Sequence, residues 1–279
     1  DDLRERLGRI VVAYNKAGKP VFARELDCIG SMCVILKDVL KPNLVQTCEH
    51  TPVFVHCGPF GNIAHGSNSV RATRLSLKLA PYVVTEAGFA ADLGAEKFVN
   101  IKCRQAGLNP NACVLVATVR ALKYHGGVEK EDLNTENLEA LKTGCENLRT
   151  HAENVLKYGL PVVVAINRFP SDTPAELDTV RQYCEEIGIE CSLSEVVAKG
   201  SEGGMDLAKK IKRVVDENPG APNYYYANTD SIKDKIQTVA REIYRADGVD
   251  YTEEADASIL RLQENGLSDW PICMAKTQA

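Results

Sequence analysis

Short apolar stretches alternate along the chain with longer segments whose apolar residues recur every three or four positions. The clearest stretch is residues 162–166, which is continuously apolar and rich in β-branched side chains, the pattern of a strand covered on both faces. Residues 138–155 place their apolar side chains on one face of a helix. Strands alternating with helices predict an α/β fold, with a mostly parallel sheet flanked by helices. Ligand sites in such sheets lie in loops at the carboxyl ends of the strands.

The same periodicities predict the other elements. A buried strand is expected over residues 52–56, further strands over 82–85, 113–118 and 189–193, and helices over 67–79, 206–215 and about 230–246. A further helix should begin after Thr173, because Thr173 can cap it, Pro174 suits its first position and Glu176 can reach back. Residues 10–14 and 20–22 predict a hairpin.

A stretch rich in proline and glycine at residues 219–223 predicts a domain boundary. We expect residues 1–219 to form the main α/β portion. Residues 220–279 would then form a smaller, truncated C-terminal α/β part.

Charge and composition exclude several classes of protein. The 33 Lys and Arg residues and 38 Asp and Glu residues are spread along the chain and give a net charge of −5, so we expect no nucleic-acid partner. No apolar run approaches the ~18 residues of a membrane span, so we expect no membrane association. The ten cysteines include no C-x-x-C pair. Their spacing predicts buried, reduced thiols in a cytoplasmic protein, and no metal site.

Three loops that follow predicted strands have the composition of ligand loops. Residues 56–69 are rich in glycine and lead into a helix, which suits either an anion or a tight structural turn. The carboxylates of residues 85–97 could orient a ligand, or Asp92 could start a helix. In residues 116–127, Arg120, Lys123 and His125 precede paired glycines. That cluster suits anion binding, and a solvated basic helix end would look similar.

A fourth loop, residues 167–173, follows the most apolar strand. The amide of Asn167 could recognise the edge of a purine, and Phe169 before Pro170 would offer a ring for stacking on a rigid turn. Alternatively, Phe169 fills the core and Asn167 caps its own turn. Residues 199–204 supply further backbone N–H groups nearby.

Taken together and in this order, these segments resemble the formate–tetrahydrofolate ligase family. Residues 116–127 read V-A-T-V-R-A-L-K-Y-H-G-G and match that family's signature at every position. The likeness extends through residues 56–68, 82–104, 162–173, 199–204 and 271–278, and therefore covers essentially the whole chain.

The resemblance implies a ligase of one-carbon metabolism. Formate and ATP would give formyl phosphate, which N10 of tetrahydrofolate then attacks to give 10-formyltetrahydrofolate. ATP would come with Mg²⁺, and the fold would be similar to that of P-loop NTPases. The family also implies a cytoplasmic homo-oligomer, usually a tetramer.

The resemblance also implies roles for individual residues. Those expected to line the folate pocket are Phe169, Pro170, Leu193, Val197, Phe89 and Gly61. Those expected to bind the nucleotide are Asn167, Lys199 and Gly203. Gly61 stands where alanine is usual, and Val197 stands where a tryptophan usually forms the second wall of the pterin slot. Either the slot lacks that wall, or another aromatic such as Trp270 supplies it.

The family's phosphate-binding motif, G-x-x-x-x-G-K-[ST], and its other glycine-rich signature, G-[LIVM]-K-G-G-A-A-G-G-G-Y, do not occur in these 279 residues. The catalytic residues are therefore expected upstream of this chain, which would be an internal part of the enzyme and inactive alone. The alternative is a split or diverged homologue that binds folate or nucleotide without catalysis.

Overall fold

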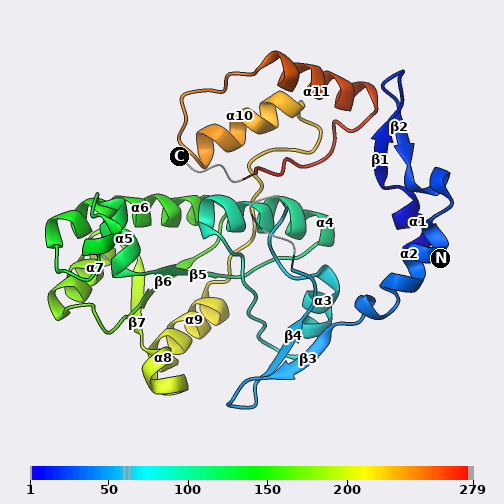
Figure 1. Ribbon diagram of the computed structural model, residues 1–279. Helices are drawn as coiled ribbons and strands as arrows, with labels where there is room; N and C mark the ends of the chain where they lie inside the picture. The colour runs from blue at the N-terminus through cyan, green and yellow to red at the C-terminus, as the bar shows by residue number, and fades with distance from the viewer. Residues whose placement is uncertain (1, 59–60, 62–63, 276–279) are drawn as a thin grey trace. The chain divides into compact units, whose positions relative to one another are not determined.

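The computed structural model describes residues 2–58, 61 and 64–275 of the chain (Figure 1). The chain divides into two compact units, one of residues 87–225 and one of residues 1–86 with 226–279. The domain division expected at residue 219/220 stays a prediction, because compactness alone does not show that a part folds by itself.

The unit of residues 87–225 contains a three-stranded parallel sheet. Its strands are β5 (Cys113–Ala117), β6 (Val162–Asn167) and β7 (Glu190–Ser194), in the order β5-β6-β7. Five of the six residues of the central strand β6 are buried, because helices cover both faces of the sheet, with α6 (Leu138–Lys157) on one side and α9 (Met205–Glu217) on the other (Figure 1). The predicted α/β fold with a parallel sheet is confirmed.

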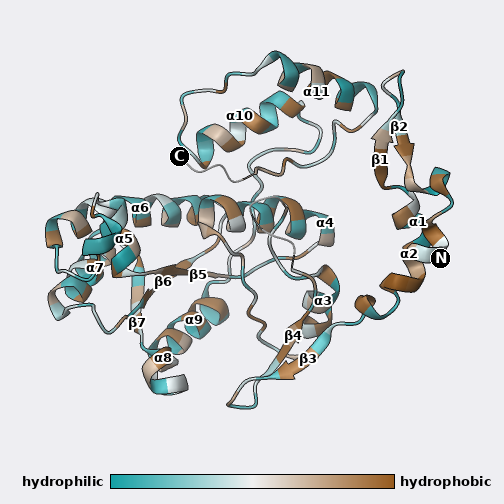
Figure 2. Cartoon of the chain, in the orientation of Figure 1, coloured by the Kyte–Doolittle hydropathy of each residue, from teal (hydrophilic) through white to brown (hydrophobic). Residues whose placement is uncertain are grey.

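Several helices of this unit begin where the sequence supplies a capping side chain. Thr118 caps α5 (Val119–His125), Asn137 caps α6, and Thr173 caps α7 (Pro174–Glu186) with the predicted capping box and Pro at the first position. The unit also contains the short helices η5 (Lys130–Asp132), α8 (Val196–Lys199) and η6 (Gly200–Gly204). Apolar and polar residues alternate along α6 (Figure 2). Its predicted apolar face is confirmed, since Leu141, Cys145 and Leu148 are buried.

A continuous helical segment begins at Ala90, where the sequence analysis expected a loop. It consists of η3 (Ala90–Ala95) and η4 (Phe98–Cys103), both π-helical, and ends in α4 (Arg104–Ala106). Asp92 lies in the first turn of this segment, and the N-cap position is Phe89, without a side-chain cap. The strand expected over residues 82–85 is wrong: this stretch is irregular, and Val84 is 94% exposed. A short apolar run makes a strand only where a neighbouring strand accepts its backbone hydrogen bonds.

The second unit contains two antiparallel hairpins and several helices. The predicted hairpin is confirmed as β1 (Val11–Tyr14) and β2 (Pro20–Phe22). The strand expected over residues 52–56 forms as β4 (Pro52–Val55), but it pairs antiparallel with β3 (Asn43–Gln46) and is only partly buried, so its expected burial is wrong. The helices are α1 (Asp2–Gly8), η1 (Ala23–Leu26), α2 (Ile29–Leu36), η2 (Asp38–Leu40), α3 (Val70–Leu79), α10 (Ile232–Glu242) and α11 (Glu253–Glu264).

All ten cysteines are free thiols in the structure. Only Cys103, Cys145 and Cys184 are buried, and Cys48, Cys57 and Cys273 are exposed. The expectation that the cysteines are mostly buried is therefore wrong. An apolar neighbourhood in sequence does not ensure burial when the element lies at the surface.

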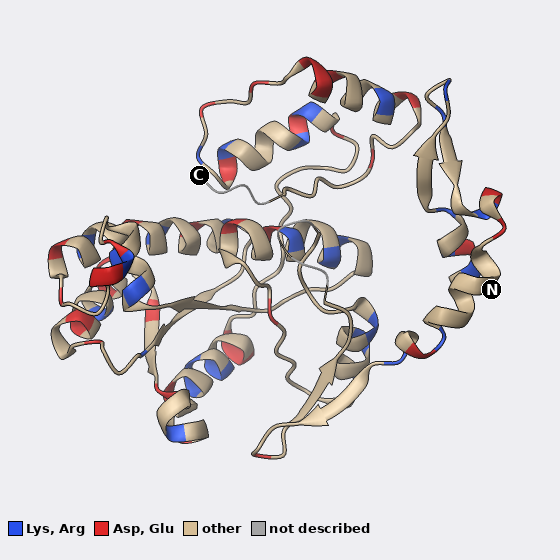
Figure 3. Cartoon of the chain, viewed as in Figure 1, with Lys and Arg blue, Asp and Glu red and all other residues tan. Residues whose placement is uncertain are grey.

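Basic and acidic residues are interspersed over the helices of each unit (Figure 3). Within the described residues, no helix is both long enough and apolar enough to cross a bilayer.

Candidate functional site

The carboxyl ends of the three parallel strands place several predicted site residues at one edge of the sheet. Asn167 at the end of β6 pairs in register with Ser194 at the end of β7. The N–H of Arg168 then donates to the Ser194 carbonyl oxygen at 3.0 Å, so the two strands stay together one residue further. The loops that follow β6 and β7 therefore leave the sheet side by side.

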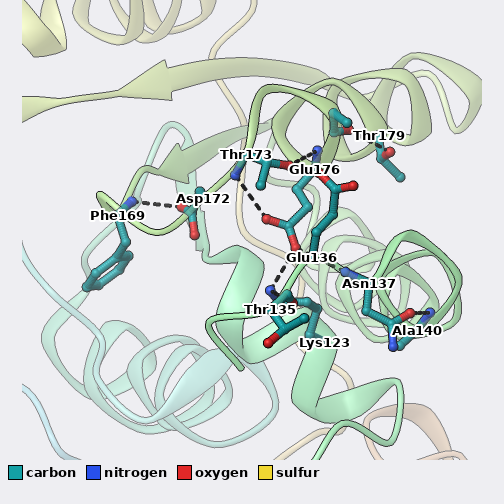
Figure 4. Close-up of polar contacts among 11 residues, drawn as sticks. Lys123, Thr135, Glu136, Asn137, Ala140, Phe169, Asp172, Thr173, Glu176 and Thr179 are labelled. Carbon is teal, nitrogen blue, oxygen red and sulfur yellow. Dashed lines mark hydrogen bonds and ion pairs between the residues drawn. The ribbon is translucent and has the colours of Figure 1, made fainter. Parts of the chain in front are cut away.

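Phe169 lies on a closed turn just after β6. Its N–H donates to the Asp172 carboxylate at 2.7 Å, and the Asp172 N–H donates back to the Phe169 carbonyl at 3.0 Å. Asp172 is buried, which raises the pKa of its carboxyl group despite the hydrogen bond from Phe169. The Phe169 side chain is 38% exposed and points away from α7 (Figure 4). The turn therefore presents an aromatic ring to solvent, and Phe169 does not fill the core.

A buried ion pair fixes the far side of the same loop. The Lys123 ammonium on α5 lies 2.7 Å from the Glu176 carboxylate on α7, with the two side chains 1% and 0% exposed. Lys123 also donates to the Thr135 carbonyl at 2.9 Å, and Glu176 accepts from the Thr173 N–H at 3.0 Å (Figure 4). Burial by itself would raise the pKa of Glu176, but the hydrogen bonds from Lys123 and Thr173 outweigh it and hold this pKa below its ordinary value.

This ion pair changes the interpretation of the signature at residues 116–127. The hypothesis that Lys123 takes part in anion binding is wrong, since its charge is buried and paired inside the protein. The glycine at position 126 also has a packing role, because a Cβ there would lie 1.8 Å from the Ala140 carbonyl oxygen. Of the basic residues in that segment, Arg120 and His125 remain accessible.

The segment after β7 is held by charge pairs and by a close backbone approach. The Glu195 carboxylate accepts from both Arg168 and Lys199 at 2.6 Å, and the bonds from Lys199 and Arg168 lower its pKa. The Glu195 N–H donates to the Gly203 carbonyl at 3.0 Å. A Cβ at position 203 would lie 2.5 Å from the Glu195 carbonyl carbon. Gly203 is thus needed for the packing of this segment, and Lys199 already has a carboxylate partner.

The family model of formate–tetrahydrofolate ligase matches residues 1–279 of the chain. The chain belongs to this family. The resemblance found in the sequence is thereby confirmed. Members of the family are ligases of one-carbon metabolism that act on formate, tetrahydrofolate and ATP in general.

Seven of the nine residues expected in the family's sites lie on β6, β7 and the segments that follow them. They are Asn167, Phe169, Pro170, Leu193, Val197, Lys199 and Gly203. Phe89 lies elsewhere in the same unit, immediately before η3, where it has a positive φ of 66° and is 47% exposed. Gly61 belongs to the other unit, as does Trp270, which is 63% exposed. Val197 is 88% exposed on α8.

A pocket of about 520 Å³ opens beside Phe169 within the unit of residues 87–225. Its lining comes from α5, from the region of η5 and from the loop after β6, and consists of Thr118, Arg120, Ala121, Tyr124, Lys130, Leu133 and Phe169. Lys130 and Leu133 lie outside every sequence motif, and only the fold brings η5 next to the loop after β6. Tyr124 belongs to the signature at residues 116–127.

Mg²⁺ takes oxygen ligands, which in proteins are mainly carboxylates. Among the described residues, no three His, Cys, Asp or Glu side chains lie together as metal ligands would. In nucleotide sites Mg²⁺ is bound largely by substrate phosphates and water. We therefore assign no Mg²⁺ ligand to this chain.

Proposed function

We propose that this chain binds tetrahydrofolate at the carboxyl end of its parallel sheet, as part of a ligase that makes 10-formyltetrahydrofolate. The observation that carries the proposal is the ring of Phe169, held exposed on a clamped turn in a chain whose whole length matches the family. A part-exposed aromatic ring held on a closed turn offers a flat face, and a flat pterin is a suitable stacking partner for it.

The overall reaction passes through formyl phosphate. Formate attacks the γ-phosphorus of ATP and releases ADP. The N10 amine of tetrahydrofolate then attacks the formyl carbon, the C–N bond forms, the C–O bond to phosphate breaks, and the N10 proton is lost. Because both steps depend on bringing reactants together in the correct orientation, the role of Phe169, Pro170, Leu193 and Val197 is to orient the pterin. Phe89 completes the pocket in this proposal.

The nucleotide is proposed to bind beside the folate. Asn167 would contact the adenine edge with its amide, and the segment of Lys199 and Gly203 would lie along the nucleotide. Lys199 would have to exchange the Glu195 carboxylate for a phosphate oxygen, since the two side chains are paired in the structure. Mg²⁺ would accompany the phosphates. The enzyme is proposed to work as a cytoplasmic homo-oligomer.

The chain on its own is expected to make no 10-formyltetrahydrofolate. The family's phosphate-binding motif does not occur in its 279 residues, and phosphoryl transfer depends on cationic and backbone groups placed around the phosphates. The measurement is product formation by the purified chain with formate, tetrahydrofolate and Mg-ATP. Turnover in the ordinary range of ~1–10² s⁻¹ would contradict this expectation.

The folate site itself is tested by binding. Phe169→Ala should weaken tetrahydrofolate binding about two- to tenfold or more, because a stacked aromatic contributes roughly 0.5–1.5 kcal/mol beyond its buried area. Val197→Trp should tighten binding by restoring the second ring. The measurement is the dissociation constant from anaerobic titration calorimetry.

Two control variants accompany these changes. Tyr244→Ala removes an aromatic that is 41% exposed in the other unit, and Ala198→Trp adds an indole next to position 197; neither should change affinity. If Phe169→Ala binds like the wild type, the proposed folate site is wrong. If Val197→Trp binds no more tightly, Val197 does not belong to the pterin wall.

A further inference from the structure

Two cysteines meet where α7 turns back into β7. Cys184 lies in the last turn of α7 and is buried, and Cys191 lies near the start of β7 and is partly exposed. The chain reverses at Gly188, which has a positive φ of 69°, and the Ile189 N–H donates to the Cys184 carbonyl at 2.9 Å. The helix packs on the strand, and the Cys184 thiol donates a hydrogen bond to the Cys191 sulfur. The fold therefore holds two free thiols in direct contact.

Positive charge lies beside the more exposed of the two thiols. The Lys210 ammonium on α9 donates to the Cys191 carbonyl at 2.8 Å, and the Arg181 side chain lies close enough to act on the same sulfur. The hydrogen bond from Cys184 and these two charges outweigh the effect of burial, and they lower the pKa of Cys191 from 9.0 to about 7. The same hydrogen bond, together with burial, raises the pKa of Cys184. Near neutral pH, the thiolate therefore forms at Cys191 while Cys184 keeps its proton.

Other cysteines of the same unit lack this combination. Burial raises the pKa of Cys103 to about 12 and the pKa values of Cys113 and Cys145 to about 11, so these thiols stay protonated and unreactive. Cys145 on α6 lies near Cys184 and is the alternative partner for it. A partly exposed thiolate with cations beside it and a second thiol in contact is the arrangement of a redox-sensitive cysteine with its resolving cysteine.

We propose that Cys191 and Cys184 form a peroxide-sensitive dithiol, a modification site at which Cys191 reacts first and Cys184 resolves. The Cys191 thiolate attacks hydrogen peroxide, the S–O bond forms, the O–O bond breaks and hydroxide leaves, which gives a sulfenic acid. The Cys184 sulfur then attacks the Cys191 sulfur, the S–S bond forms, the S–O bond breaks, and hydroxide leaves with the Cys184 proton as water. Peroxide thereby accepts the two electrons that the pair of thiols loses, and an external dithiol reverses the change by thiol–disulfide exchange.

Mass spectrometry of one peptide tests this inference. Trypsin cleaves after Arg181 and Lys199, so residues 182–199 form a single peptide that contains these two cysteines and no other. The reduced chain is treated with a small excess of hydrogen peroxide, and the remaining thiols are alkylated with N-ethylmaleimide under denaturing conditions before digestion. The peptide should lose two hydrogens and take no alkyl group, and it should take two alkyl groups if dithiothreitol is applied first. If both cysteines stay alkylatable after peroxide, or if Cys184 is joined instead to the separate peptide that carries Cys145, the inference is wrong.

Variants test the separate roles of the two thiols, and the wild-type measurement does not depend on their folding. Cys184→Ala should stop the reaction at a Cys191 sulfenic acid, which dimedone traps, whereas Cys191→Ala should leave Cys184 unoxidised. Lys210→Gln should slow disulfide formation about two- to fivefold near pH 7, because less of Cys191 is ionised. The matched controls are Lys209→Gln, at an exposed position on the same helix, and Cys273→Ala, which removes an exposed thiol; neither should change the rate. If Cys184→Ala yields no sulfenic acid, or if Cys191→Ala yields one at Cys184, the proposed order of reaction is overturned.

Discussion

Replacing Lys123 by methionine is expected to lower the free energy of unfolding by about 3–5 kcal/mol, the usual cost of removing one partner of a buried ion pair. Methionine has nearly the same length but no charge, so the Glu176 carboxylate, which is 0% exposed, would lose its cation. The Thr135 carbonyl would also lose its donor. The pair joins α5 to α7, and the loop that carries Phe169 leads directly into α7. The loss should therefore also disturb the candidate site.

Urea unfolding of the wild type and the variant gives this difference directly. Lys142→Met, at an exposed position on α6, should change stability by less than about 0.5 kcal/mol. The double variant Lys123→Met/Glu176→Gln should recover part of the loss, because it leaves no unpaired charge and keeps the capping contact to Thr173. If Lys123→Met lowers the free energy of unfolding by less than about 1 kcal/mol, the ion pair is not a major source of stability and this prediction is wrong.

Sequence reasoning succeeded where the deciding interactions are local. The capping box of Thr173 and Glu176 is formed by residues three positions apart, and the structure shows both of its hydrogen bonds. The continuous apolar run of β6 needs burial on both faces wherever it lies in the fold. Such features are fixed by short-range stereochemistry, so they could be predicted from the pattern alone.

It failed where a long-range partner decides. Local composition groups Lys123 with Arg120 and His125 as a basic cluster, but the Lys123 side chain is buried. One signal could have shown this: Val119, Leu122 and Lys123 follow the helical spacing of a buried face, and all three are buried. Its partner Glu176 is 53 residues away, and no local pattern identifies that pairing.

The candidate site was predicted in part by a different kind of information. The family signature identified the segments after β6 and β7, and the parallel topology explains why they meet. The pocket beside Phe169 could not be foreseen, because Lys130 and Leu133 come from a segment without any motif and reach it only through the packing of α5, η5 and the loop after β6.

A second large effect is expected at Glu96, which lies inside the π-helical segment and is 0% exposed. One carboxylate oxygen accepts from the Asn100 amide at 2.9 Å, and the other has no hydrogen-bond partner within the described residues. Burial raises the pKa of Glu96 from its ordinary 4.5 to about 7, although Asn100 and the nearby Lys97 and Arg104 act in the opposite direction. At neutral pH, ionisation of this buried carboxyl group therefore lowers the free energy of unfolding.

The free energy of unfolding should accordingly fall as the pH rises from 4.5 to 7, because across that window the folded state binds the proton more tightly than the unfolded state does. Over the whole pH window, this pKa shift lowers the free energy of unfolding by about 3 kcal/mol. Glu96→Gln resembles the protonated side chain, so it should match the wild type near pH 4 and exceed its stability by about 2–3 kcal/mol at pH 8. Denaturant unfolding of both proteins between pH 4 and pH 8 measures this, with Glu186→Gln at an exposed site on α7 as the control. A difference between Glu96→Gln and the wild type that stays constant with pH would show that Glu96 has the same pKa in the folded and unfolded states, and that the buried carboxylate has a compensating partner.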